Sequence, residues 1–218
     1  AGDTGKTTRD IIQLKLLGLP GNFGTGLIPK DCIIRTLQKQ GVADAVEMAY
    51  IKLISGGQSL LSLKSYDQRR EAFQGTEVDD IWLDEEPPQE IYTECLLRTM
   101  TTNGIVSTTF TPLMGLSDVV LSFCPGGELV EGTVKDTATK HVTVCDWDSV
   151  PHLSQKEKDE MYAAIPPFQR DARSKGIPQL GSGAIYQVPE SDVVIDDFEI
   201  PKHWPRAYGM DVGWNKTA

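Results

Sequence analysis

The sequence lacks several features that would assign it to a well-defined class of protein. No run approaches the roughly 18 consecutive apolar residues that a membrane span needs, so we do not expect an integral membrane protein. No basic stretch followed by an apolar one opens the chain, so no signal peptide is predicted. The four cysteines form no Cys-x-x-Cys pair, which favours reduced thiols over a disulfide scaffold or a zinc site.

An excess of positive charge is also missing. The 21 Lys and Arg residues are outnumbered by 31 Asp and Glu residues, which gives a formal net charge of −10. A protein that coats DNA binds by neutralising phosphates, so this balance disfavours that class. It is still compatible with a protein that has a local basic channel and acidic metal sites. With 39% hydrophobic and 24% charged residues, the composition is that of an ordinary globular protein.

The first third of the chain predicts a helix and a β-hairpin. A helix is expected over 8–17, capped by Thr7 or Thr8 and ended by Gly18. Strands at 46–54 and 59–65 flank a Ser-Gly-Gly-Gln turn and form the hairpin. A short basic helix is expected next, over 66–73.

The middle of the chain predicts a βαβ crossover. A buried strand at 81–84, a helix at 89–100 and a second strand at 105–110 have the required spacing. We therefore expect a parallel sheet that is covered on both faces.

The last third predicts a smaller α+β region. It is expected to contain a helix with a Ser154–Glu157 capping box and a second, basic helix that ends at Gly176. The strands expected around these helices lie at 132–134, 142–145, a pair that opens at 181–183, and 206–211.

Two carboxylates follow the apolar strand directly. Asp84 and Glu85 stand where a buried strand leaves the sheet, which is where open α/β sheets bind ligands. Hydrolysis of a nucleoside triphosphate needs one carboxylate near Mg²⁺ and a second to orient and deprotonate the attacking water. Pro87 and Pro88 cannot extend the strand and end it. The alternative is an acidic turn after an edge strand.

Hydroxyl groups end the next strand along the chain. Thr108, Thr109 and Thr111 could sense the γ-phosphate or the attacking water, and could signal the loss of the phosphate to the rest of the protein. The alternative is that threonine is simply a good strand former.

Gly5-Lys6-Thr7 ends like the phosphate-binding P-loop, G-x-x-x-x-G-K-[ST]. The first glycine of that motif would precede Ala1, and no strand leads into the loop. We therefore interpret Lys6 as a surface lysine near the start of a helix.

Many stretches taken together resemble the large terminase subunit of tailed bacteriophages, in a group with Asp-Glu-Glu-Pro-Pro after the apolar strand. They are Gly2-x-Thr4-Gly5-x-x-Thr8-Arg9-Asp10, Gly24-Thr25-Gly26-x-Ile28-Pro29-x-Asp31, Lys64-Ser65-Tyr66, 81–88, 108–112, 117–120, Ala172-Arg173-x-Lys175-Gly176-Ile177-Pro178, 181–183, 203–206 and Gly209-Met210-Asp211-x-Gly213-Trp214.

The resemblance implies three parts. Residues 1–145 are expected to form part of an ATPase domain with a P-loop NTPase-type parallel sheet, and 146–204 a small α+β lid or linker. Residues 205–218 would begin a nuclease domain of RNase H-like fold. The P-loop is expected upstream of Ala1 and the other nuclease ligands beyond Ala218, so the chain alone is expected to be inactive.

The resemblance also implies roles for individual residues. Asp84 would bind the Mg²⁺ of ATP and Glu85 would activate water, while Thr108, Thr109 and Thr111 couple hydrolysis to motion of the lid. Asp211 would bind the Mg²⁺ or Mn²⁺ of the nuclease. Arg70 or Arg69 is a candidate arginine finger that reaches a neighbouring subunit's ATP.

The implied function is ATP-driven translocation of double-stranded viral DNA into the procapsid, with endonuclease cutting. The implied partners are the DNA, the portal protein, the small terminase subunit and further copies in a ring, in the cytoplasm of the bacterial host and not in the mature virion. Two alternatives remain open: a helicase-like NTPase, and a non-catalytic chain that only binds partners.

Overall fold

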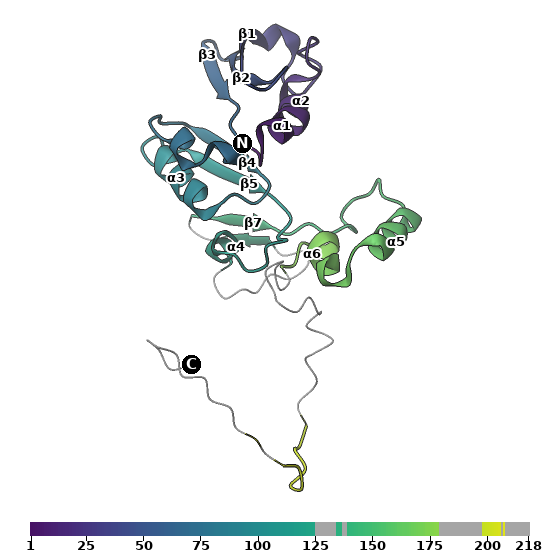
Figure 1. Cartoon of the computed structure of the whole chain (residues 1–218). Helices are drawn as coiled ribbons and strands as arrows, with labels where there is room; N and C mark the ends of the chain where they lie inside the picture. The colour runs from purple at the N-terminus through teal and green to yellow at the C-terminus, as the bar shows by residue number, and fades with distance from the viewer. Residues whose placement is uncertain (125–133, 137–138, 179–197, 206, 208–218) are drawn as a thin grey trace.

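Three groups of elements follow one another along the chain: an antiparallel sheet with a helical run, a parallel strand pair with a helix, and a C-terminal set of short helices (Figure 1). The computed structural model describes residues 1–124, 134–136, 139–178, 198–205 and 207. The fold is mixed α/β, as the sequence predicts. The boundaries expected at 145 and 204 stay predictions.

The first helical run is longer than the sequence predicts. It consists of α1 (Gly5–Thr7), a π-helical stretch (Thr8–Gln13) and α2 (Leu14–Leu17). It begins at Gly5 because the Thr4 hydroxyl accepts a hydrogen bond from the Thr7 amide at 3.2 Å. It ends where predicted, at Gly18, whose φ of 93° suits a residue without a side chain.

The antiparallel sheet has the order β1-β2-β3, with β1 (Ile33–Gln38), β2 (Val46–Lys52) and β3 (Gln58–Ser62). The predicted hairpin is confirmed as β2–β3. Strand β1 was not predicted, because most of its side chains are exposed and its pairing with β2 is irregular, so its sequence does not alternate. The helical run packs on one face of the sheet through a cluster formed by Ile12, Leu17, Val46, Ala49 and Leu63.

The basic helix expected over 66–73 is wrong. Two 3-10 turns, Tyr66–Gln68 and Arg70–Phe73, stand there instead. Arg69 lies between them with a φ of 61°, in the left-handed region that a helix cannot accommodate.

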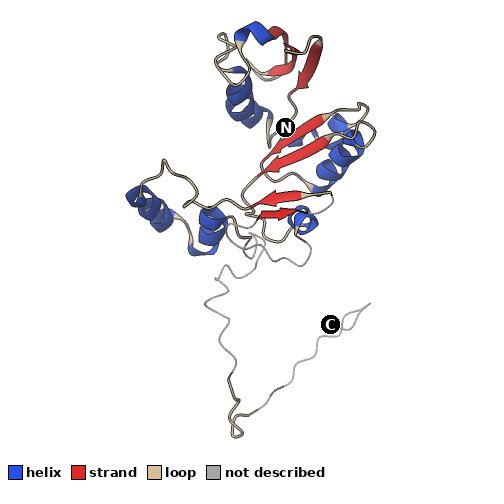
Figure 2. Ribbon diagram, turned by 180° about the vertical axis from the view of Figure 1, so that it is seen from behind, coloured by secondary structure: helices blue, strands red, loops and turns tan. Residues whose placement is uncertain are grey.

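The predicted βαβ crossover is confirmed. Strands β4 (Asp80–Asp84) and β5 (Ile105–Thr109) pair in parallel, and α3 (Gln89–Thr99) connects them (Figure 2). Helix α3 packs on one face through Leu83 of β4, which is fully buried with Ile91, Tyr92 and Cys95.

The expected cover on both faces of this sheet is found only in part among the residues that the structure describes, because on the face opposite α3 Trp82 packs against the cluster of the antiparallel sheet. On the face opposite α3, Ile105 is 64% exposed and Ser107 and Thr109 are exposed too. Ile105 is apolar although it is exposed on the face away from α3, so the sequence pattern overstated the cover. Asp84, which shares this face, is half-buried.

Helix α4 (Asp118–Phe123), not predicted as a helix, follows β5. Strands β6 (Val134–Asp136) and β7 (His141–Thr143) then pair antiparallel, within two residues of the expected positions. Helix α5 (Gln155–Ala164) has the predicted Ser154–Glu157 capping box.

A 3-10 turn (Pro167–Gln169) and α6 (Arg170–Lys175) complete the C-terminal set. Gly176 ends α6 in the left-handed conformation, as predicted. The strands expected from 181 and over 206–211 lie outside the described residues.

Two features of the described residues concern membrane spans and cysteines. None of the described helices combines the length and the apolar character that crossing a membrane requires. No disulfide joins the cysteines.

Candidate functional site

A chain of hydrogen bonds fixes the side chain of Asp84 at the carboxyl end of β4. The Thr109 hydroxyl of β5 donates to Asp84 Oδ1 at 2.8 Å, and the Trp82 indole Nε1–H donates to the Thr109 oxygen at 2.9 Å. Because the indole can only donate, the single hydroxyl proton of Thr109 is left for Asp84. These bonds orient the carboxylate on the face of the sheet opposite α3.

The parallel register separates the three threonines that the sequence groups together. Thr109 pairs with Asp84 and shares its face, whereas Thr108 pairs with Leu83 on the face covered by α3. Thr111 lies beyond the end of β5 and is half-buried. Thr109 is therefore the hydroxyl that the structure brings to Asp84.

Glu85 has an unusual backbone conformation. Its φ is 67°, in the left-handed region, which costs a residue other than glycine about 1–3 kcal/mol. The amide of Glu85 donates to the Thr109 carbonyl at 2.8 Å, which continues the pairing with β5. The Glu85 side chain at this turn is exposed, whereas that of Asp84 is half-buried. Two adjacent carboxylates can thus serve two separate positions.

The Tyr66 hydroxyl bonds to this strained turn, a contact that the sequence analysis did not predict. Its phenol oxygen lies 3.0 Å from the carbonyl oxygens of both Asp84 and Glu85. Burial, followed by the nearby charge of Asp84, raises the pKa of the Tyr66 phenol well above its usual value, so the hydroxyl stays protonated and can donate. No spacing rule links Tyr66 to a strand end so far along the chain.

Replacing Tyr66 with Phe tests this support. We expect a loss of about 1 kcal/mol in the free energy of unfolding, since one hydrogen bond to the turn is removed while the ring still fills the core. Chemical denaturation of the chain measures the loss. Tyr50→Phe, a change on the antiparallel sheet, is the matched control. An unchanged midpoint in Tyr66→Phe would show that the hydroxyl does not hold the turn.

Glu86 has different surroundings from Asp84 and Glu85. It is half-buried, and the Ser117 hydroxyl donates to its Oε1. Burial raises the pKa of Glu86, and the hydrogen bond from Ser117 opposes that shift.

The Gly5-Lys6-Thr7 motif does not form a phosphate cradle. Its amides already bind protein groups: Gly5 donates to Asp67 Oδ2 at 3.2 Å and Thr7 to the Thr4 hydroxyl at 3.2 Å. Lys6 is exposed, as predicted.

The two candidate arginine fingers differ in their surroundings. The Arg70 guanidinium lies 3.8 Å from Glu94 of α3, a carboxylate that is 5% exposed and also pairs with Arg98 at 3.1 Å. The Arg70 side chain remains 47% exposed. Arg69 is exposed. Asp211, the candidate nuclease ligand, lies outside the described residues.

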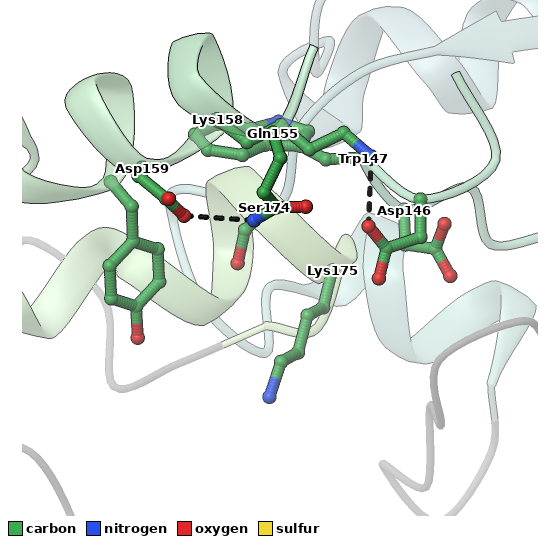
Figure 3. Close-up of a pocket in the computed structure, with 9 residues that line it drawn as sticks. Asp146, Trp147, Gln155, Lys158, Asp159, Ser174 and Lys175 are labelled. Carbon is green, nitrogen blue, oxygen red and sulfur yellow. Dashed lines mark hydrogen bonds and ion pairs between the residues drawn. The ribbon is translucent and has the colours of Figure 1, made fainter. Parts of the chain in front are cut away.

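A pocket of about 150 Å³ lies in the C-terminal helical region, and the acidic strand end (Asp84, Glu85 and Glu86) is not part of its lining. Its lining comes from 146–148 and from α5 and α6 (Figure 3). The Lys158 ammonium, in a side chain that is only 14% exposed, pairs there with Asp148 at 2.9 Å. Gln155 donates to Asp159 at 2.8 Å. These polar groups are paired with one another, and we assign the pocket no ligand.

Comparison with known proteins adds to this geometry. The family profile described as "Terminase large subunit, T4likevirus-type, N-terminal" matches residues 3–192. The large terminase subunit of Salmonella phage P22 is 34% identical over 222 residues, which cover 98% of this chain and 43% of that protein. The large terminase subunit of Enterobacteria phage LP7 is 36% identical over 128 residues, 59% of this chain and 25% of that protein. No solved structure matches the chain.

The chain therefore spans less than half the length of these two relatives. The family profile nevertheless covers most of the chain, including the acidic strand end and the residues around it. This chain belongs to the family of phage large terminase subunits.

Proposed function

We propose that the chain carries part of the ATP-hydrolysing centre of a motor that packages double-stranded viral DNA. The observation that carries this proposal is the geometry at the end of β4. Asp84 is fixed by a hydroxyl from the neighbouring strand, and a left-handed turn directs Glu85 elsewhere. Ligands of open α/β sheets bind at this edge, and triphosphate hydrolysis needs two carboxylates with separate tasks.

The donor groups at this edge fit a magnesium ion that arrives with ATP. Such an ion is commonly held by one or two carboxylates together with phosphate oxygens and water, so it needs no closed cage of protein ligands. Asp84 would hold the ion, and the ion would neutralise phosphate charge that develops during hydrolysis.

Glu85 would be the residue that activates water. Its carboxylate is exposed and is set apart from Asp84 by the backbone turn, so it can accept a proton from a water molecule beside the phosphate. Thr109 is the candidate sensor, because its hydroxyl already bonds to Asp84 and responds to any movement of that carboxylate. Thr108 and Thr111 would transmit the change along the same strand end.

The remaining parts of the proposal follow from membership of the family. The motor would be a ring of copies that binds double-stranded DNA, the portal protein and the small terminase subunit in the cytoplasm of the bacterial host. A nuclease domain of RNase H-like fold would cut the DNA with Mg²⁺ or Mn²⁺ bound at Asp211.

A packaging assay tests the proposal. Full-length subunit, small subunit, procapsids, DNA and Mg-ATP are mixed, and DNA protected from added nuclease is measured. We expect protection that depends on ATP hydrolysis. A strand-displacement assay on the same protein separates the alternative: unwinding of a duplex without protection would favour a helicase-like NTPase. Absence of ATP hydrolysis in the full-length protein would contradict the proposal.

A further inference from the structure

The third acidic residue of the motif, Glu86, has surroundings unlike those of its two neighbours. It is half-buried, and its Oε2 atom is inaccessible to solvent and has no hydrogen-bond partner among the described residues. Its Oε1 accepts the hydroxyl proton of Ser117. Leaving a buried carboxyl oxygen without a partner is costly. A half-buried carboxylate with one unpartnered oxygen does not favour stability, so the position of Glu86, two residues after Asp84, suggests a functional role.

Ser117 has two tasks at once. Its oxygen accepts the Val120 amide at 3.2 Å and so caps the N-terminus of α4, while its proton goes to Glu86. A hydroxyl has one proton and two lone pairs, so both bonds can form together. Glu86 is therefore linked to the N-terminus of α4. This helix is firmly packed, since its Val119 and Val120 are 2% exposed.

Helix α4 is in turn joined to the C-terminal elements. The Lys140 ammonium, one residue before β7, donates to the Ser122 carbonyl of α4 and lies 5.2 Å from the centre of the Phe123 ring. Further on, the Trp147 amide donates to the Ser174 carbonyl of α6 at 2.8 Å. Contacts thus lead from Glu86 through α4 to Lys140, and the chain that continues from Lys140 through β7 reaches α6 at Trp147.

We propose that Glu86 is a positioning residue. Its bond to Ser117 makes α4 move together with the acidic strand end, and α4 transmits that movement to the C-terminal helices. The proposal rests on the proposed ATPase function and deepens it, since it assigns the third carboxylate to coupling and not to the chemistry. Contiguous contacts alone do not demonstrate coupling, so the test measures coupling directly.

A double-mutant cycle in the full-length subunit provides that test. Glu86→Ala and Ser117→Ala should each lower the DNA-stimulated kcat about tenfold and leave KM for ATP within about twofold, as expected for residues along a coupling path. The double variant should be no slower than Ser117→Ala alone, because that single change already removes both the bond to Glu86 and the cap on α4. Losses that multiply in the double variant, or an unchanged kcat in Glu86→Ala, overturn the proposal.

Two further variants separate the bond from general damage. Glu86→Gln keeps an oxygen that accepts from Ser117 and should retain at least about half of the kcat, so a loss as large as that of Glu86→Ala overturns the proposal. Glu90→Ala removes an exposed glutamate from the first turn of α3 and is the matched control.

Amide hydrogen exchange gives a readout that does not depend on ATP hydrolysis. Glu86→Ala leaves the Ser117 cap intact but should speed exchange in α4 and β7 about fivefold, with the rates of β2 and β3 unchanged, since local opening is governed by local contacts. If the parent protein hydrolyses no ATP, the proposed function fails, and this exchange result alone decides the role of Glu86. Unchanged exchange in α4 overturns the proposal.

Discussion

Replacing Glu85 with Gln in the full-length subunit is expected to lower ATP turnover about a thousandfold, within the range for loss of a general base. The amide has nearly the shape of the carboxylate but cannot take a proton from water. The exposed side chain leaves the left-handed turn and its hydrogen bond to Thr109 undisturbed. Binding of ATP should therefore change by no more than about threefold. Steady-state turnover and titration with labelled ATP measure the two quantities separately.

Two comparisons make this result specific. Glu90→Gln introduces the same chemical change at an exposed position on α3 and should leave turnover unaltered. Asp84→Asn should weaken the response to Mg²⁺, because it changes the carboxylate that Thr109 holds. If the Glu85→Gln variant hydrolyses ATP as fast as the parent, the general base is another residue, and the role proposed for Glu85 is wrong.

The sequence predicted those elements whose signals are local. The helix stop at Gly18, the capping box at Ser154 and the break after α6 at Gly176 each depend on a few neighbouring residues, and each is confirmed. The crossover from β4 to β5 was also predictable, because a buried strand leaves a short apolar run. Strand β1 escaped because its side chains are mostly exposed, so only its pairing with β2 makes it a strand.

The candidate site divides in the same way. Asp84 and Glu85 could be found from their place after an apolar run. The distinction between Thr108 and Thr109 could not, because it depends on the register between β4 and β5, and a shift of one residue exchanges the faces. The support from Tyr66 and the bond from Ser117 to Glu86 connect residues far apart along the chain, and no local pattern encodes such contacts.

The second large effect on ATP turnover is expected from replacing one of the two candidate arginine fingers, Arg70 and Arg69. An arginine finger supplied by a neighbouring subunit is worth about 10³–10⁵ in turnover. Arg70 meets two requirements for such a group: nearly half of its side chain is exposed, and the buried Glu94 restrains it. A restrained cation needs little reorganisation when it meets phosphate charge. Arg69 is exposed, and no ion pair holds it among the described residues. We therefore expect Arg70→Gln to lower turnover about a thousandfold and Arg69→Gln to have little effect.

Mixing two inactive variants decides whether Arg70 acts across subunits. Arg70→Gln subunits retain Glu85, and Glu85→Gln subunits retain Arg70. A mixed ring therefore contains some interfaces with both groups intact, and mixing should restore part of the turnover that each variant lacks alone. If Arg70 works only within its own subunit through Glu94, no interface is repaired and the mixture stays inactive. Arg70→Lys distinguishes the planar guanidinium from simple positive charge, since a lysine cannot form the same paired hydrogen bonds to phosphate. Recovery on mixing, together with failure of the lysine variant, would identify Arg70 as a finger acting in trans.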